Sequence, residues 1–139
     1  AWRNLWFHTG DLGVFDEHGL LTFIDRIKDC IRRRGENISA TEIESTLTGL
    51  KGVAELSAFA VPSEMPGGED EIMLAVVADD DRRELDLAQL GKAADELLPR
   101  FARVRYLEQL PELPKTASGK IQRKQLQERG RDNTFDRGL

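Results

Sequence analysis

Two apolar runs, residues 53–61 and 72–78, constrain the fold of this 139-residue chain more than any other feature. Both runs are rich in Val, Ile, Ala, Leu and Phe, and the segment between them, PSEMPGGED, has the Pro, Gly and acidic residues of a loop. Short apolar runs bounded by such residues are typical of buried β-strands. We therefore expect two neighbouring strands of one sheet.

Two segments are expected to form helices that pack on this sheet. Ser39 and Glu42 have the spacing of a capping box, in which the serine caps the glutamate amide and the glutamate side chain reaches back. A helix is therefore expected over about residues 40–48. Asp86 stands in the same capping position before residues 87–98, whose leucines and alanines keep helical spacing until a proline ends them.

The remaining segments complete an α+β fold. Residues 12–15 and 20–24 are apolar and are separated by DEHG, which predicts a β-hairpin. Residues 103–106 alternate polar and apolar, as a strand with one wet face does, and residues 121–129 predict a short, mostly exposed helix. A small sheet with helices against it is the expected packing. Because an isolated hairpin is marginal in water, the first hairpin is expected to belong to a larger protein.

Composition excludes several classes of protein. The net charge of −5 argues against a nucleic-acid binder, whose affinity would come from neutralising phosphates. The apolar runs are all far too short to span a membrane. Cys30 is the single cysteine, which excludes an internal disulfide and favours a cytoplasmic location. Residues 79–81 are consecutive aspartates without spacers, so no metal site is predicted.

Two short motifs could carry chemistry. Lys120 follows Ser118 and Gly119 and precedes the last expected helix, so its ammonium would lie where backbone amides and the helix dipole favour an anion. It is either such a functional cation or an ordinary solvated lysine. Asp11 follows Thr9 and Gly10, and its carboxylate would either accept hydrogen bonds from a ribose diol or cap the turn into the hairpin.

Three ordered motifs together carry a specific resemblance. FHTGDLG at residues 7–13, DRIKDCIRRRGENISATEIE at 25–44 and LPKTASGKIQR at 113–123 resemble the last three core motifs of the acyl-adenylate-forming superfamily. This superfamily includes acyl- and aryl-CoA synthetases, the adenylation domains of peptide synthetases and firefly luciferase. The resemblance covers nearly the whole chain except the tail.

The resemblance implies a two-domain enzyme of which this chain is the C-terminal part. Residues 1–27 would be the end of a large N-terminal domain, residues 28–128 the small C-terminal domain, and residues 129–139 a flexible tail. The implied function is that of an ATP- and CoA-dependent acid-thiol ligase, which forms acyl-AMP and pyrophosphate and then acyl-CoA and AMP. The substrates would be a small carboxylic acid, ATP and CoA. Mg²⁺ is expected to bind through the N-terminal domain, and the fragment alone is expected to be inactive.

The resemblance also assigns residues. Asp11 matches the aspartate that binds the ribose hydroxyls of ATP, and Arg26 matches an arginine that contacts the nucleotide. Lys28 falls at the hinge. Lys120 matches the catalytic lysine that bridges the carboxylate substrate and the α-phosphate. After a rotation of the small domain, the loop with Gly35 and Glu36 would bind CoA, since a glycine allows close passage of the pantetheine arm.

Departures from the family pattern give a subfamily preference and leave alternatives. Asp25 stands where many members have Gly, and Asn37 stands where acetate-type enzymes have Arg. The residues around GENIS are most similar to those of carnitine-type and fatty acyl-CoA ligases. One alternative is an adenylation domain that loads a carrier protein. Another is a stand-alone binding module without catalysis. The run Arg32–Arg34 would either meet CoA phosphates or form a solvated face.

Overall fold

The structure is a computed structural model that describes residues 2–3, 6–65 and 67–139. A mixed sheet lies at its centre, with the strand order β10-β9-β8-β7. Strands β7 and β8 are antiparallel, β8 and β9 are parallel, and β9 and β10 are antiparallel. The bounds are β7 Val53–Val61, β8 Glu71–Ala78, β9 Tyr106–Gln109 and β10 Phe135–Asp136. The two strands expected from the apolar runs are therefore confirmed as neighbours.

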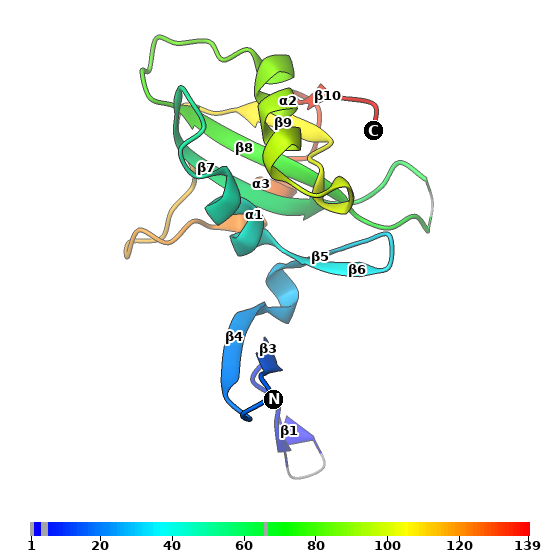
Figure 1. Ribbon diagram of the computed structural model, residues 1–139. Helices are drawn as coiled ribbons and strands as arrows, with labels where there is room; N and C mark the ends of the chain where they lie inside the picture. The colour runs from blue at the N-terminus through cyan, green and yellow to red at the C-terminus, as the bar shows by residue number, and fades with distance from the viewer. Residues whose placement is uncertain (1, 4–5, 66) are drawn as a thin grey trace.

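Helices cover both faces of the sheet, which gives the α+β architecture (Figure 1). Along β8, Ile72, Leu74 and Val76 pack with the helices α1 and α2, while Met73 and Ala75 pack on the other face with α3. This alternation follows from the two-residue period of a strand. The helices are α1 Ala40–Leu47, α2 Leu87–Leu97 and α3 Arg123–Glu128. No described helix combines the length and apolarity needed to cross a bilayer.

The expected N-caps of α1 and α2 are confirmed. The hydroxyl of Ser39 accepts a hydrogen bond from the Glu42 amide at 3.1 Å, and the Asp86 carboxylate accepts one from the Gln89 amide at 3.0 Å. Each side chain satisfies an amide that has no partner within its helix. The Ser39 hydroxyl in turn donates to Asp25 at 2.6 Å, a contact that the capping pattern did not predict.

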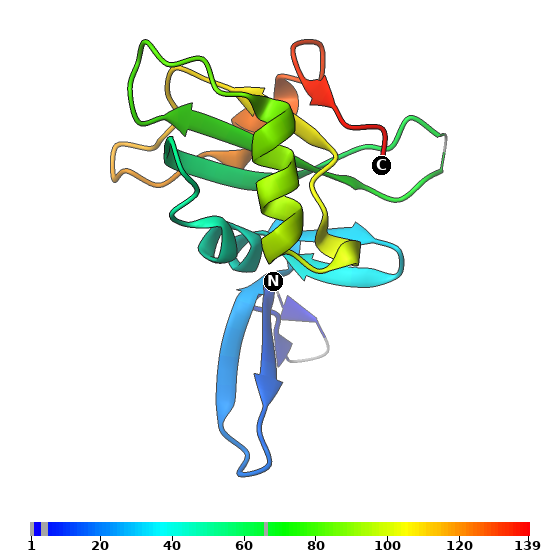
Figure 2. The ribbon, with the colours of Figure 1, turned by 45° about the horizontal axis from the view of Figure 1, so that its top comes forward.

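Hairpins precede the sheet. The predicted hairpin is formed by β3 Asp11–Phe15 and β4 Leu21–Arg26, and it projects from the rest of the chain (Figure 2). A 3₁₀ turn, η1 Ile27–Asp29, leads to a second hairpin of β5 Cys30–Arg33 and β6 Glu36–Ser39. A further short pair joins β1 Trp2–Arg3 to β2 Trp6–Phe7. The sequence did not predict the second hairpin, because its basic run hides the alternation of Ile31 and Ile38 with polar residues.

The projecting hairpin exposes apolar side chains. Phe15, Leu21 and Phe23 are 68%, 63% and 60% exposed. Contiguous apolar surface of this kind marks a contact site for another part of a protein or a partner.

Two expected elements are displaced. The strand expected over residues 103–106 begins only at Tyr106, since a 3₁₀ turn at Arg100–Ala102 precedes it. Val104 is nevertheless fully buried, so the apolar positions were correctly placed although the strand was not. The last helix begins at Arg123 and not at residue 121, because Ile121 pairs with Lys115 in an isolated β-bridge.

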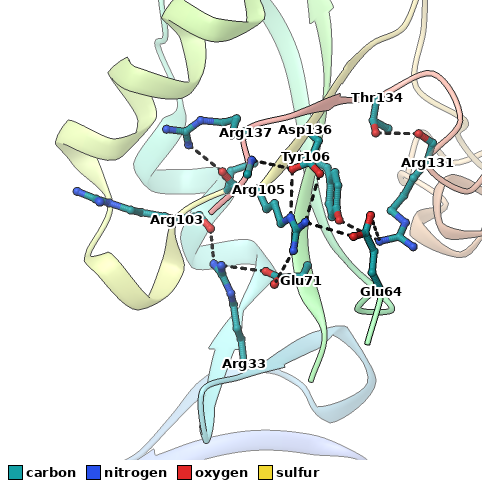
Figure 3. A network of polar contacts seen from close by, with 12 residues as sticks. Arg33, Glu64, Glu71, Arg103, Arg105, Tyr106, Arg131, Thr134, Asp136 and Arg137 are labelled. Atoms are coloured by element: carbon teal, nitrogen blue, oxygen red, sulfur yellow. Dashed lines mark hydrogen bonds and ion pairs between the residues drawn. The ribbon is translucent and has the colours of Figure 1, made fainter. Parts of the chain in front are cut away.

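Residues 129–139, expected to form a flexible tail, include the short strand β10, which ionic contacts join to the sheet domain. Arg105 holds Asp136 through two nitrogen-oxygen contacts of 3.1 and 3.2 Å (Figure 3). Arg137 lies 2.6 Å from Asp95. The Arg105 and Arg137 guanidinium groups lower the pKa of Asp136 and Asp95 respectively through these hydrogen bonds. Ion pairs leave no hydrophobic pattern, which is why this strand could not be predicted from the sequence.

Candidate functional site

Asp11 and Arg26 form the first part of the candidate site. They are register partners at the open end of the β3–β4 hairpin, and Arg26 Nε lies 3.1 Å from Asp11 Oδ1. The Asp11 amide donates to the Thr9 hydroxyl at 3.2 Å, which fixes the backbone before the strand. The Asp11 side chain remains 34% exposed, so its carboxylate can accept further hydrogen bonds from a ligand.

Lys120 closes a tight loop. The Thr116 amide donates to the Lys120 carbonyl at 2.8 Å, and the Lys120 amide donates to the Thr116 hydroxyl at 3.1 Å. Gly119 has a φ of +81°, a conformation that favours glycine. The backbone of Lys120 is therefore fixed while its side chain is exposed to solvent. Lys120 does not lie at a helix N-terminus as expected, because α3 begins three residues later.

A groove of about 520 Å³ lies beside the Lys120 loop. Its wall includes Asp29, the last residue of the turn η1, and Cys30, the first residue of β5, together with Phe59 from β7 and Lys124 from α3. The groove therefore connects the Lys120 loop to the segment that follows the β3–β4 hairpin. Burial raises the pKa of the Cys30 thiol, which keeps it protonated and argues against a nucleophilic role for this cysteine.

Gly35 lies at the tip of the second hairpin. Arg34 and Gly35 join β5 to β6 with φ values of 53° and 78°, as a type I′ turn requires of both central residues. A Cβ added at Gly35 would meet no atom within 4 Å, so the side of the turn where a side chain would project is open. Glu36 follows as the exposed first residue of β6. In both ribbon views this turn and the Lys120 loop lie at opposite sides of the sheet domain (Figures 1 and 2).

The three consecutive arginines have different environments. Arg33 is only 3% exposed, donates to the Arg103 carbonyl and lies 2.9 Å from Glu71 Oε2. That last contact is an ion pair without aligned hydrogen-bond geometry. Arg32 and Arg34 are exposed. A solvated face is thus excluded for Arg33, and only the other two arginines are free to meet an anion.

Asp25 ties the end of the first hairpin to α1. Its carboxylate accepts hydrogen bonds from the Ser39 hydroxyl at 2.6 Å and the Arg26 amide at 2.8 Å, and the Thr41 amide lies 3.4 Å away. Burial acts to raise the pKa of Asp25, but these hydrogen bonds outweigh it and the pKa lies below its ordinary value. Sequence reasoning noted Asp25 only as a departure from Gly. Lys28 lies within η1, between Asp25 and Ser39 in the chain.

The structure brings together some of the expected residues and separates others. Asp11 and Arg26 are in contact, whereas Lys120 and Gly35 lie on different loops of the sheet domain. Sequence reasoning missed Glu69, whose carboxylate contacts the Gly35 turn. The acidic loop composition around it was read only as a loop signature, because no periodic pattern marks a side chain that binds a turn.

Comparison with known proteins places the chain in context. Residues 42–120 match the family described as AMP-binding enzyme C-terminal domain. The chain is 39% identical over 124 residues to a probable CoA ligase of Humulus lupulus, covering 89% of this chain and 23% of that protein. It is 37% identical to a 2-succinylbenzoate–CoA ligase of Listeria monocytogenes (89% and 26%) and 35% identical to the long-chain-fatty-acid–CoA ligase FadD13 of Mycobacterium tuberculosis (92% and 25%).

Solved structures give the same result. ATP-bound MatB from Rhodopseudomonas palustris superposes with a TM-score of 0.75 at 31% identity, covering 91% of this chain and 24% of that one. The o-succinylbenzoate CoA synthetase MenE from Bacillus subtilis, in complex with its acyl-adenylate intermediate, gives 0.72 at 31% identity (90% and 25%). The chain spans about a quarter of the length of the curated relatives and the structures it matches.

Proposed function

Because this chain belongs to the AMP-binding enzyme C-terminal domain family, we propose that it is the C-terminal part of an acyl-CoA synthetase. The observation that carries the proposal is the placement of two distinct loops, with Lys120 and Gly35, on opposite sides of one small domain. A domain built in this way can offer a cation to one reaction and an open turn to another. Two-step chemistry of acyl-AMP and then acyl-CoA requires both.

We propose the domain division as follows. Residues 1–27 end a large N-terminal domain, and residues 28–128 form the small domain. The exposed apolar side chains of the β3–β4 hairpin support this division, because a large domain would cover them. Lys28, within the 3₁₀ turn between hairpin and sheet domain, is the proposed hinge. Residues 129–139 dock on β9 and extend the small domain.

In the first step the carboxylate of the acid attacks the α-phosphate of ATP. A carbon-bound oxygen forms a bond to phosphorus, and pyrophosphate leaves with the electrons of the broken phosphorus-oxygen bond. Asp11 accepts hydrogen bonds from the ribose hydroxyls, and Arg26 holds that carboxylate in place and contacts the nucleotide. The Lys120 ammonium stabilises the negative charge shared by the carboxylate and the α-phosphate. The N-terminal domain would hold Mg²⁺, which would neutralise negative charge on the phosphates.

In the second step the CoA thiol attacks the acyl carbonyl of acyl-AMP. A carbon-sulfur bond forms, AMP leaves with the electrons of the carbon-oxygen bond, and the thiol proton passes to solvent. Rotation about Lys28 brings Gly35 and Glu36 to the active site. The space around Gly35 supports close passage of the pantetheine arm. The exposed Arg32 and Arg34 are the cations available to CoA phosphates.

The substrate class is a carboxylic acid. The names of the relatives include a succinylbenzoate ligase and a long-chain fatty acid ligase, which supports aromatic or fatty acids and gives a carnitine-type substrate no particular support. Carrier-protein loading is not favoured over CoA, since these relatives are named as CoA ligases. A cytoplasmic location, suggested by the single cysteine, completes the proposal.

The test compares two proteins in one assay. The full-length enzyme that carries this chain and the isolated 139-residue chain receive ATP, Mg²⁺, a panel of carboxylic acids and either CoA or a phosphopantetheinylated carrier protein. We expect the full-length enzyme to form a thioester with free CoA and the isolated chain to release no pyrophosphate. Steady turnover by the isolated chain would contradict the domain division. Preference for the carrier protein would contradict the choice of thiol.

A further inference from the structure

The Gly35 turn is held from outside by one carboxylate. The Gly35 amide donates to Glu69 Oε1 at 3.0 Å, and the Arg34 amide donates to Glu69 Oε2. In a type I′ turn the amides of the two central residues point away from the strand pair, so they need partners elsewhere. A carboxylate that accepts from two consecutive amides makes charge-assisted hydrogen bonds, which are stronger than neutral ones.

The two residues after Glu69 continue the contact along the hairpin. The Asp70 amide donates to the Arg32 carbonyl at 3.1 Å. Glu71, at the start of β8, forms the ion pair with buried Arg33 described above. Residues 69–71 therefore contact residues 32–35 one after another along the hairpin. We call these three acidic residues the clasp.

The clasp connects the turn to the rigid part of the domain. Glu71 also contacts Arg105 Nη1 at 3.4 Å, and Arg105 holds Asp136 in the tail (Figure 3). The last residue of the clasp, Glu71, is thus part of the sheet, where β8 is the most buried strand. Glu69 is the exposed end of the clasp. Its only described hydrogen bonds are those to the turn.

We propose that Glu69 is a positioning residue for acyl transfer to CoA, because its carboxylate fixes the Gly35 turn in the conformation that receives the thiol arm. This inference rests on the proposed function. It goes further by assigning to the β7–β8 loop a role in the second step alone. The adenylation step, which uses Lys120 on the opposite side of the domain, does not involve this turn.

The test separates the two half-reactions in the full-length enzyme. Glu69→Gln keeps the side-chain size but removes the charge and one of the two acceptors. We expect it to slow conversion of supplied acyl-AMP and CoA to acyl-CoA by about tenfold, a smaller loss than the roughly 100-fold cost of a misplacement of about 1 Å, because one of the two acceptors remains. Acid-dependent adenylation should stay within about twofold of wild type, because the Lys120 loop is untouched.

Glu64→Gln is the matched control. Glu64 lies on the same β7–β8 loop and is exposed, but its contacts are long ion pairs of 3.7 and 3.9 Å to Arg105 and Arg131. It should leave both half-reactions unchanged. A general loss of loop charge would instead slow transfer in both variants, and that outcome would overturn the assignment to Glu69.

Hydrogen exchange reports on the conformation of the Gly35 turn independently of the reaction rate. Hydrogen exchange of the peptide covering residues 33–36, measured by mass spectrometry, should accelerate in Glu69→Gln and not in Glu64→Gln. Unchanged exchange, unchanged transfer, or an equal loss in both half-reactions would overturn the inference. If wild-type enzyme forms no acyl-AMP at all, the proposed function fails first, and the exchange result still decides whether the clasp holds the turn.

Discussion

Replacing Lys120 by alanine in the full-length enzyme should lower the rate of acyl-adenylate formation by at least about 100-fold, the loss typical for removal of one group that stabilises a transition-state charge. The loop of Thr116 to Lys120 keeps its backbone hydrogen bonds in this variant, because they involve the Thr116 hydroxyl and main-chain atoms. Only the ammonium is lost. Acid-dependent exchange of pyrophosphate into ATP measures this step.

The second half-reaction provides the contrast. Formation of acyl-CoA from supplied acyl-AMP should remain near wild type, since the Gly35 turn lies on the other side of the domain. Lys124→Ala is the matched control, because Lys124 lines the same groove and its side chain is 87% exposed. An equal loss in both half-reactions, or an equal loss in the Lys124 variant, would remove Lys120 from its assigned role.

The second large effect concerns stability. Glu44→Ala should destabilise the 139-residue chain by about 3 kcal/mol, the range for breaking a largely buried charged network. The Glu44 carboxylate accepts hydrogen bonds from the Ser57 hydroxyl and the Ala58 amide, both at 2.9 Å. It also forms an ion pair with Arg123 at 2.6 Å, and both of these side chains are less than one-fifth exposed.

The location explains the size of the effect. Strand β7 is at the edge of the sheet, so the Ala58 amide has no strand partner on that side. Glu44 from α1 provides the acceptor and at the same time anchors Arg123 at the start of α3. Without it, both the amide and the guanidinium lose their partner.

Thermal unfolding followed by circular dichroism measures this change. A loss of about 3 kcal/mol corresponds to a fall in Tm of about 10 °C for a domain of this size. Glu42→Ala on the same helix is the control, because the Glu42 side chain is exposed and makes no hydrogen bond among those described, so the variant loses a favourable interaction with the helix dipole. Equal Tm values for the two variants would show that the Glu44 network contributes no more than surface charge.

The fold could be predicted where a local pattern determines the structure. Ser39 and Asp86 cap helices in the structure as their positions indicate, and the apolar runs over 53–61 and 72–78 pair as strands. These features depend on neighbours in sequence, which periodicity and capping rules describe.

The rest of the fold depends on contacts between distant residues. Strand β10 is held by Arg105 and Arg137, and the β5–β6 hairpin is held by Glu69 and Glu71. Such pairs of charged side chains look like solvated surface in a sequence. One signal was available for Glu44, which lies four residues after the buried Ala40 and therefore at the border of the packed face of α1.

For the candidate site, the resemblance to a known family supplied the residues and not their arrangement. The contact of Asp11 with Arg26 depends on a shift of the hairpin register between Leu12 and Gly13, which the DEHG loop does not indicate. The helix-terminus argument for Lys120 failed, because the chain pairs Lys115 with Ile121 before α3 begins. The roles of Asp11, Arg26, Lys28, Lys120 and Gly35 with Glu36 stay predictions.

A single-turnover experiment on the full-length enzyme tests the central claim most directly. Enzyme in excess is mixed with ATP, Mg²⁺ and an acid found active in the panel, first without and then with CoA, and the products are identified by mass spectrometry. We predict pyrophosphate and bound acyl-AMP before CoA is added, and acyl-CoA with an equal amount of AMP afterwards. Formation of ADP, pyrophosphate release that does not depend on the acid, or acyl-AMP that persists after CoA is added would contradict the two-step account.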